Sequence, residues 1–423
     1  MKRTASLTLL ASLAGANSLN SPFPYNSTVP TPFHVSVDSS FIEESRLKAS
    51  LYRPSVDLLD GDISNAGWLE GPPHANMTAL AEYWSKDYDW AKAQDEINAN
   101  SSHFAITIPS TGNYKYPVPL HFVHERSDAD NAIPLLLLHG WPSTHREWSK
   151  VIEPLRSPTE SSTQAFHVVV PDLPGFGFSP APVSSGMDAR EMGDALNQLM
   201  IKLGYDKYGV VGTDLGWVVS LFIAADSPDN VIGFFSDFWF IQANATDLER
   251  RAQNQTTEEE TLYIDSNQDF VNNHFSYSLA HEQTPLAIGQ AMSDTPVGFA
   301  GWIWHLVYWI NDGYEYTFDE LITNTVLLSI QGAFANIRSY KTTLPLLSEL
   351  PYINVPTGAS VWGLNGGPLA SLGNAQLTPR SWIERLVNLK FYSKHEHGGH
   401  FPAQTEPEVW SADLQSFFGG LVN

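Results

Sequence analysis

The chain has 423 residues, of which 43% are hydrophobic and 12% aromatic, enough apolar material for a large packed fold and too much chain for one average domain. Its formal net charge of −23 argues against nucleic acid and anionic membrane surfaces as partners, because both repel an acidic protein. It contains no cysteine, which excludes disulfides, thiolate catalysis and cysteine-ligated zinc.

The N-terminus has the pattern of a secretory signal peptide. Lys2 and Arg3 precede an apolar run at 5–14, and Ala14 and Ala16 offer the small residues that a signal peptidase reads. The run is too short to span a bilayer. We therefore expect removal of residues 1–16 and a secreted protein without stable membrane insertion. Sequons for a secreted glycoprotein occur at Asn26, Asn76, Asn100, Asn244 and Asn254, but their number is near that expected by chance and adds only weak support for export.

The sequence predicts an N-terminal region at residues 17–130. A loose arm at 17–40, rich in Ser, Pro and Asn, precedes a mostly helical stretch at 41–98. The segments HFAITIP (103–109) and LHFVHER (120–126) alternate between apolar and polar residues, as strands do.

From residue 131 the pattern becomes that of a parallel sheet. The short apolar runs IPLLLLHG, FHVVVPDLPG, KYGVVGTDLG and VIGFFSDFW are typical of strands buried on both faces, and helical stretches such as 188–204 separate them. The alternation is lost in the aromatic-rich, mainly helical segment 240–346 and resumes in 347–423. This order predicts an α/β fold with a mostly parallel sheet, in which a helical cap (240–346) divides the core into 131–239 and 347–423.

The motif GTDLG follows one of these strands and opens a helix. It matches the nucleophile elbow G-x-S-x-G of the α/β-hydrolases, with Asp214 in the serine position. Taken alone the motif is weak, since an aspartate here could simply cap the following helix.

Two further motifs occupy the places that this fold requires. HGWP (139–142) ends the first buried strand, where the loop contributes to an oxyanion hole, and the backbone N–H groups of Trp141 and Leu215 are the expected donors. His400, in EHGGHF, follows the last strand, where a hydrolase places its histidine. An ordinary Gly-Pro turn and a structural histidine are the alternatives for each motif alone, but the order of all three favours a catalytic site.

An aspartate nucleophile changes the reaction. A carboxylate can attack a saturated carbon to give an alkyl ester, and water deprotonated by His400 can then hydrolyse this ester. The substrates that fit are epoxides and alkyl halides, and neither reaction requires a metal or an organic cofactor. An epoxide needs a proton donor for its leaving oxygen, so tyrosines in the cap would favour it.

Along nearly its whole length after the signal segment, the chain resembles the microsomal epoxide hydrolases and their fungal relatives. The resemblance rests on PFHV, RLKASLYRP and EYWSKDYDWAKAQDEIN in an N-terminal meander, on HGWPST, PGFGFSP and GTDLG in the core, on SYSLAHEQTP and SDTPVGFAGWI in the cap, and on HGGHFPA. It implies a small hydrophobic epoxide and water as partners, with Asp214 as nucleophile and His400 as base. It places Tyr277 and Tyr340 as ring-opening proton donors, and we expect Trp302 to contact the substrate. A homodimer is compatible with it.

The sequence departs from the family at the third catalytic member. Where relatives have an Asp or Glu, this chain has Asn365, and no acidic residue occurs anywhere from 351 to 383. The acid would orient the histidine and stabilise its charged form. Asp237, at the end of the strand before the cap, stands where relatives usually have asparagine, so we expect the acid to have moved to Asp237. A helix cap is the alternative for this residue, and the missing acid would then indicate either an inactive relative or an enzyme that forms the ester but hydrolyses it slowly.

The sequence leaves two other functions open. A haloalkane dehalogenase would need tryptophan or asparagine donors facing Asp214. A hydrophobic-ligand-binding protein without turnover would follow if the loss of the usual acid had abolished catalysis.

Overall fold

The computed structural model describes residues 20–57, 66–160 and 163–422. The predicted signal peptide at 1–16 lies outside these ranges. Within them, none of the helices combines the length and apolar character needed to cross a bilayer.

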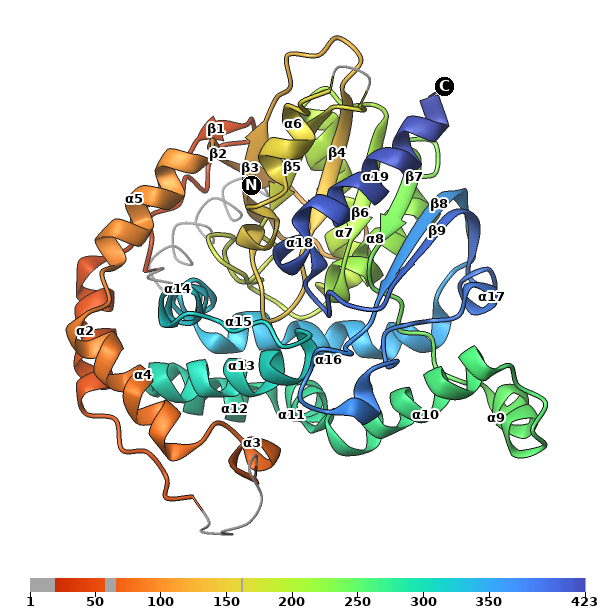
Figure 1. The fold of residues 1–423 in the computed structure, drawn as a ribbon. Coiled ribbons are helices and arrows are strands. Elements are labelled where there is room, and N and C mark those ends of the chain that lie inside the picture. Colours follow the sequence, from red (N-terminus) through yellow and green to blue (C-terminus); the bar gives the residue numbers. More distant parts are fainter. Residues whose placement is uncertain (1–19, 58–65, 161–162, 423) are drawn as a thin grey trace.

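A single sheet of nine strands, in the order β1-β2-β3-β5-β4-β6-β7-β8-β9, forms the centre of the molecule (Figure 1). The first three strands of this order pair antiparallel with their neighbours, and β4 to β9 pair parallel. The predicted mostly parallel sheet is confirmed. The strands are β1 (Thr31–Pro32), β2 (His103–Ile108), β3 (Val118–Glu125), β4 (Ile133–Leu138), β5 (Phe166–Pro171), β6 (Tyr208–Gly212), β7 (Val231–Ser236), β8 (Ile353–Trp362) and β9 (Val387–His395).

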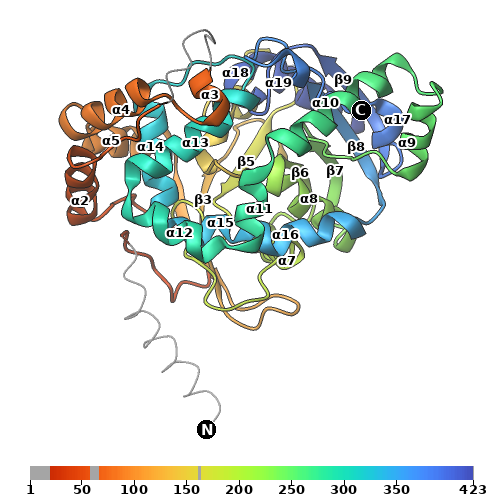
Figure 2. The ribbon, with the colours of Figure 1, turned by 90° about the horizontal axis from the view of Figure 1, so that it is seen from below.

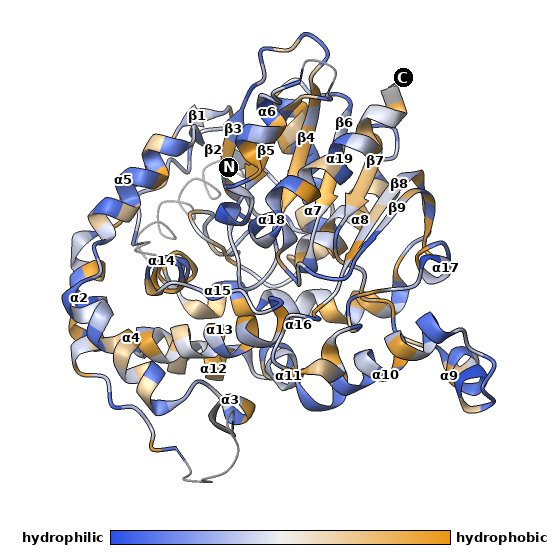
Figure 3. Cartoon of the chain, in the orientation of Figure 1, coloured by the Kyte–Doolittle hydropathy of each residue, from blue (hydrophilic) through white to orange (hydrophobic). Residues whose placement is uncertain are grey.

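The central strands are apolar throughout because both of their faces are covered. In β4, Leu136 and Leu138 face one core cluster while Leu135 and Leu137 face another, as the two-residue period of a strand requires. Figure 3 shows β4 and β7 largely in the hydrophobic colour. The covering helices include α7 (Ala189–Lys202) and α8 (Asp214–Asp226) on the first cluster, and α6 (Ile152–Arg156) and α19 (Pro407–Val422) on the second.

The remaining core helices lie in the connections between strands or, in the case of α18 (Pro402–Thr405), after the last strand β9. Those in the connections are η1 (His145–Trp148), η3 (Ala370–Leu372) and α17 (Arg380–Ile383).

A helical cap fills the connection between β7 and β8, as the sequence predicts for 240–346. It lies across the ends of the parallel strands, as the view from below shows (Figure 2). Its helices are α9 (Ala245–Ala252), α10 (Glu258–Asn273), α11 (Ser276–Gln283), α12 (Pro285–Asp294), α13 (Pro296–Ile310), α14 (Phe318–Ser329), α15 (Ala333–Ile337), α16 (Ser339–Thr343) and η2 (Leu344–Glu349).

The N-terminal region is continuous with the core, because its strands β1, β2 and β3 extend the central sheet. Its helices form an arc from the sheet edge to the cap (Figure 1), where α4 packs against α13 and α14. These helices are α2 (Ser39–Ser50), α3 (Ala66–Glu70), α4 (His74–Lys86) and α5 (Trp90–Asn100).

Candidate active site

Asp214 stands on a sharp turn between β6 and α8. Its φ of +47° is in the left-handed region, which residues other than glycine rarely adopt. The flanking glycines are required by close backbone contacts: a Cβ at Gly212 would lie 2.3 Å from the carbonyl oxygen of Gly216, and a Cβ at Gly216 would lie 2.3 Å from that of Leu138. The motif GTDLG therefore forms the strand–turn–helix that its sequence predicts, with the carboxylate at the carboxyl end of the sheet.

The two predicted backbone donors lie beside this carboxylate. The N–H of Trp141 donates to Asp214 Oδ1 at 2.9 Å, and a Cβ at Gly140 would lie 2.3 Å from the Asp214 Cβ, so the loop approaches as closely as only glycine permits. Burial raises the pKa of Asp214 to about 6, although the backbone N–H groups of Trp141 and Leu215 act to lower it. This arrangement can stabilise negative charge on Oδ1 during a reaction at the carboxyl carbon.

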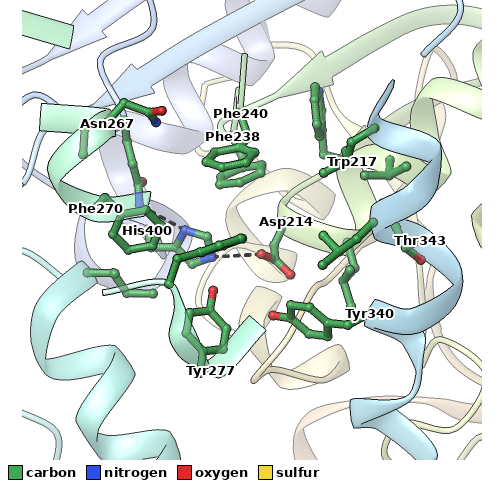
Figure 4. Close-up of a pocket in the computed structure, with 18 of the residues that line it drawn as sticks. Asp214, Trp217, Phe238, Phe240, Asn267, Phe270, Tyr277, Tyr340, Thr343 and His400 are labelled. Atoms are coloured by element: carbon green, nitrogen blue, oxygen red, sulfur yellow. Dashed lines mark hydrogen bonds and ion pairs between the residues drawn. The ribbon is translucent and has the colours of Figure 1, made fainter. Parts of the chain in front are cut away.

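His400 faces the other oxygen of Asp214. Its Nε2 lies 3.7 Å from Asp214 Oδ2, and a dashed line marks this pair in Figure 4. Its backbone N–H donates to the carbonyl oxygen of Ile310 in the cap at 2.8 Å, which fixes the loop after β9. Burial lowers the pKa of His400 to about 4, so the ring is neutral at physiological pH and can accept a proton.

The predicted tyrosines meet in front of Asp214, although they come from different cap helices. Tyr277 lies in α11 and Tyr340 in α16, with ring centroids 6.0 Å apart, and both phenols point into the space before the carboxylate (Figure 4). Burial raises the pKa of each well above the ordinary value. Both phenols are therefore protonated at neutral pH and can donate a hydrogen bond.

The cavity that these groups share is mostly apolar. Phe238 and Phe240 lie above Asp214 and His400 (Figure 4). Other lining residues are Trp217, Val218, Phe270, Phe275, Ile310, Leu344, Leu347 and Leu364. A wall of this kind favours a hydrophobic small molecule with one polar reacting centre.

Asp237 does not occupy the predicted place beside His400. Its Oδ2 accepts a hydrogen bond from the indole Nε1 of Trp410 at 2.6 Å, on the α19 side of the sheet. The next residue, Phe238, instead packs edge-to-face on the His400 ring, with centroids 5.2 Å apart. Phe238 lines the cavity, whereas the side chain of Asp237 does not and bonds Trp410 instead. The expectation that Asp237 hydrogen-bonds the histidine is wrong in this structure.

Asn365 and Trp302 also lie outside the group around Asp214. The Asn365 amide donates to the backbone oxygen of Glu396 at 2.8 Å and has no contact with His400. The indole of Trp302 donates to Nε2 of His281 at 3.0 Å. Trp302 lines a second hollow between the N-terminal region and the cap, which meets the cavity of Asp214 only at Phe270 and Tyr277. The structure therefore corrects the expected direct contact of Trp302 with a substrate at Asp214.

The sequence alone does not identify three residues of the site, which are Phe238, Phe240 and Gln376. Phe238 and Phe240 alternate with Asp237 and Trp239 directly after β7, and this two-residue period could have shown that they share a face. Gln376 lies in a loop without periodicity, yet its Nε2 is 3.2 Å from His400 Nδ1. No local pattern in the sequence indicates that contact.

Within the described ranges, one group of side chains has the spacing of metal ligands, and it lies away from this cavity. His121, His145 and Asp172 are buried together. The Nδ1 atoms of the two histidines are 2.8 and 2.9 Å from the Asp172 oxygens. Hydrogen bonds between these atoms account for the cluster without an ion.

Comparison with known proteins gives the same family along the chain. The family model described as "Epoxide hydrolase N terminus" matches residues 30–148, and that described as "alpha/beta hydrolase fold" matches residues 133–304. A putative epoxide hydrolase of Stigmatella aurantiaca is 28% identical over 92% of this chain and 85% of its own length. The juvenile hormone epoxide hydrolase of Bombyx mori is 27% identical over 92% and 86%.

Solved structures share the fold. The epoxide hydrolase of Aspergillus niger has a TM-score of 0.80 at 24% identity, covering 96% of this chain and 100% of that one. The Bombyx mori enzyme has a TM-score of 0.81 at 24% identity, covering 93% and 95%. Fold and turn geometry together define an α/β-hydrolase with aspartate at the nucleophile elbow. With its N-terminal region and its relatives, the chain belongs to the epoxide hydrolase family.

Proposed function

We propose that this protein hydrolyses a small hydrophobic epoxide to a vicinal diol through an alkyl ester on Asp214. The observation that carries the proposal is the pair of neutral phenols, Tyr277 and Tyr340, that face the Asp214 carboxylate across an apolar cavity. A nucleophile and a proton donor on opposite sides of one small space are what opening an epoxide ring requires.

In the first step Asp214 Oδ2 attacks a ring carbon. The bond from that carbon to the epoxide oxygen breaks, and the oxygen takes a proton from one of the two tyrosines. Oδ1 is the oxygen held by the Trp141 N–H, so Oδ2, on the side of His400, is left to attack. The product is a hydroxyalkyl ester of Asp214 and a tyrosinate.

In the second step water attacks the carboxyl carbon of Asp214 while His400 Nε2 takes a proton from it. The N–H groups of Trp141 and Leu215 stabilise the negative charge that develops on Oδ1. The bond from the carboxyl carbon to the alkyl oxygen breaks, and His400 returns its proton to that oxygen to release the diol. The proton left on Asp214 goes back to the tyrosinate, and the cycle closes.

The dehalogenase alternative has less support. It requires N–H donors that face the leaving halide, and the indole N–H of Trp141 is donated to Asn336 Oδ1 at 3.0 Å instead. Phenols suit an alkoxide leaving group, which must be protonated. Halide release from a haloalkane panel, with no diol from epoxides, would favour the dehalogenase.

Isotope labelling tests the proposal. In ¹⁸O-water with enzyme in excess over an aryl epoxide, the diol of the first turnover should carry ¹⁶O, because the oxygen added to the ring comes from Asp214. The label should appear in the carboxylate of Asp214 and then in later diol. Label in the first diol at full water enrichment would show direct attack by water and contradict the ester pathway.

We also propose that the chain is secreted as a glycoprotein after cleavage behind Ala16. Among the described sequons, Asn26, Asn100, Asn244 and Asn254 are exposed, so an oligosaccharide can reach them. Expression in a eukaryotic secretory host should give medium-borne protein that begins at Asn17 and loses mass on deglycosylation. Retention in the cytosol with an intact N-terminus would contradict this.

A further inference from the structure

The Nδ1 of His400 faces an amide rather than a carboxylate. Gln376 Nε2 lies 3.2 Å from it, and this is the one hydrogen bond of the Gln376 side chain within the described residues. Asp237 is bonded to Trp410. Since no acidic residue occurs from 351 to 383, the loop that reaches the histidine cannot supply a negative charge.

The fold fixes the position of Gln376 from both sides. Leu372 and Leu377 are fully buried on either side of it, at 0% and 1% exposure. Immediately after them, the hydroxyl of Thr378 donates to the backbone oxygen of Trp239 at 2.5 Å, which ties the loop to the segment that follows β7. A side chain held by such anchors can orient a partner at little entropic cost.

We propose that Gln376 is the positioning residue of His400 and that the histidine therefore works without a carboxylate partner. The inference rests on the proposed function, because it assigns a role within ester hydrolysis. With Gln376 Oε1 turned to Nδ1, the amide accepts the Nδ1–H and leaves Nε2 free to take a proton from water.

A neutral partner has a measurable consequence. It orients the ring but adds no negative charge to stabilise the imidazolium that forms when water is deprotonated. The two steps therefore differ in their dependence on residue 376. Ester formation does not use His400 and is insensitive to this residue, whereas ester hydrolysis depends on its orientation and its charge.

Titration of His400 tests the contact without any substrate. In ¹⁵N-histidine-labelled protein, the signal of His400 is assigned by its loss in His400→Gln. Gln376→Glu should raise the pKa of His400 by about one unit or more, because it places a carboxylate at Nδ1. Asp237→Asn, the matched change at the acid that the sequence predicts, should leave the pKa of His400 unchanged. A shift in Asp237→Asn and none in Gln376→Glu would overturn the proposal.

Single-turnover kinetics test the role. Gln376→Leu should form the Asp214 ester at the wild-type rate and hydrolyse it about 10- to 100-fold more slowly, the scale on which orienting partners act. Gln376→Glu should restore hydrolysis and move its acid limb to higher pH, which a merely structural role of Gln376 would not do. Equal loss of both steps in a folded Gln376→Leu protein would refute the assignment. If the wild-type enzyme forms neither ester nor diol, the proposed function fails, while the titration still decides the contact.

Discussion

Burial and hydrogen bonding act in opposite directions on the carboxyl of Asp214. Burial dominates and raises its pKa to about 6, against the lowering effect of the Trp141 and Leu215 N–H groups. Only the ionised form is a nucleophile, so ester formation should fall as pH drops through about 6 and stay constant above it until the tyrosines ionise. Rapid-quench measurement of ester formation from pH 4.5 to 9 checks this. A rate that remains flat down to pH 4.5 would contradict it.

Removal of the tyrosine hydroxyls should slow ester formation and leave ester hydrolysis nearly unchanged. Tyr277→Phe and Tyr340→Phe should each slow ester formation, and the double variant should lose about 10²- to 10⁴-fold, the range typical of general acid catalysis. Hydrolysis of a preformed ester should be nearly unchanged. Tyr314→Phe is the matched control, because its hydroxyl bonds Glu320 outside the cavity. Full activity in the double variant would remove the tyrosines from the mechanism.

The packing of α4 against the cap holds the N-terminal region in place. Leu80, at 0% exposure, lies in a cluster with Val297 and Ile322 of the cap. Leu80→Ala should lower the free energy of unfolding by about 2–5 kcal/mol, the usual cost of such a cavity. Leu47→Ala, on the exposed face of α2, should change it by less than about 0.5 kcal/mol. Denaturant unfolding measures both, and equal values would show that α4 contributes no stability through this contact.

Elements also show how far the sequence can predict this site. The strands of the parallel sheet can be predicted because burial on both faces makes them continuous apolar runs. Asp214 and His400 can be predicted because each comes shortly after such a run. The roles of Asp237 and Gln376 are a matter of side-chain direction. The sequence shows that Asp237 and Phe238 are neighbours after a buried strand. It does not show which of the two side chains faces the cavity. The path of the loop that carries Gln376 depends on anchors such as Thr378 to Trp239, which are far apart in the chain.

Buried histidines make the stability of the folded protein depend on pH. Burial lowers the pKa of many of them, to about 3 for His103 and about 4 for His139. The unfolded chain takes up these protons near pH 6.5 and the folded chain does not, so each such histidine destabilises the fold as pH falls below about 6.5. Three buried carboxyls act in the opposite direction but are fewer: burial raises the pKa of Asp214 and of Asp237 to about 6 and that of Glu147 well above its usual range. The other histidines whose pKa burial lowers are His121, His124, His167, His274, His281, His305 and His400.

The net prediction is that the melting temperature falls steadily between pH 6.5 and pH 4. Calorimetry in buffers of constant ionic strength checks this. A melting temperature that rises over the same interval would mean that the buried carboxyls outweigh the histidines.

Peptide mass spectrometry of His400→Gln after brief exposure to an aryl epoxide tests covalent catalysis by Asp214 most directly. Without the base, the ester should form and persist, and the peptide that contains Asp214 should gain the mass of the epoxide. The wild-type protein should show the same adduct only transiently, with diol appearing as it decays. An unmodified Asp214 peptide in the variant, with diol still produced by the wild-type enzyme, would contradict covalent catalysis by Asp214.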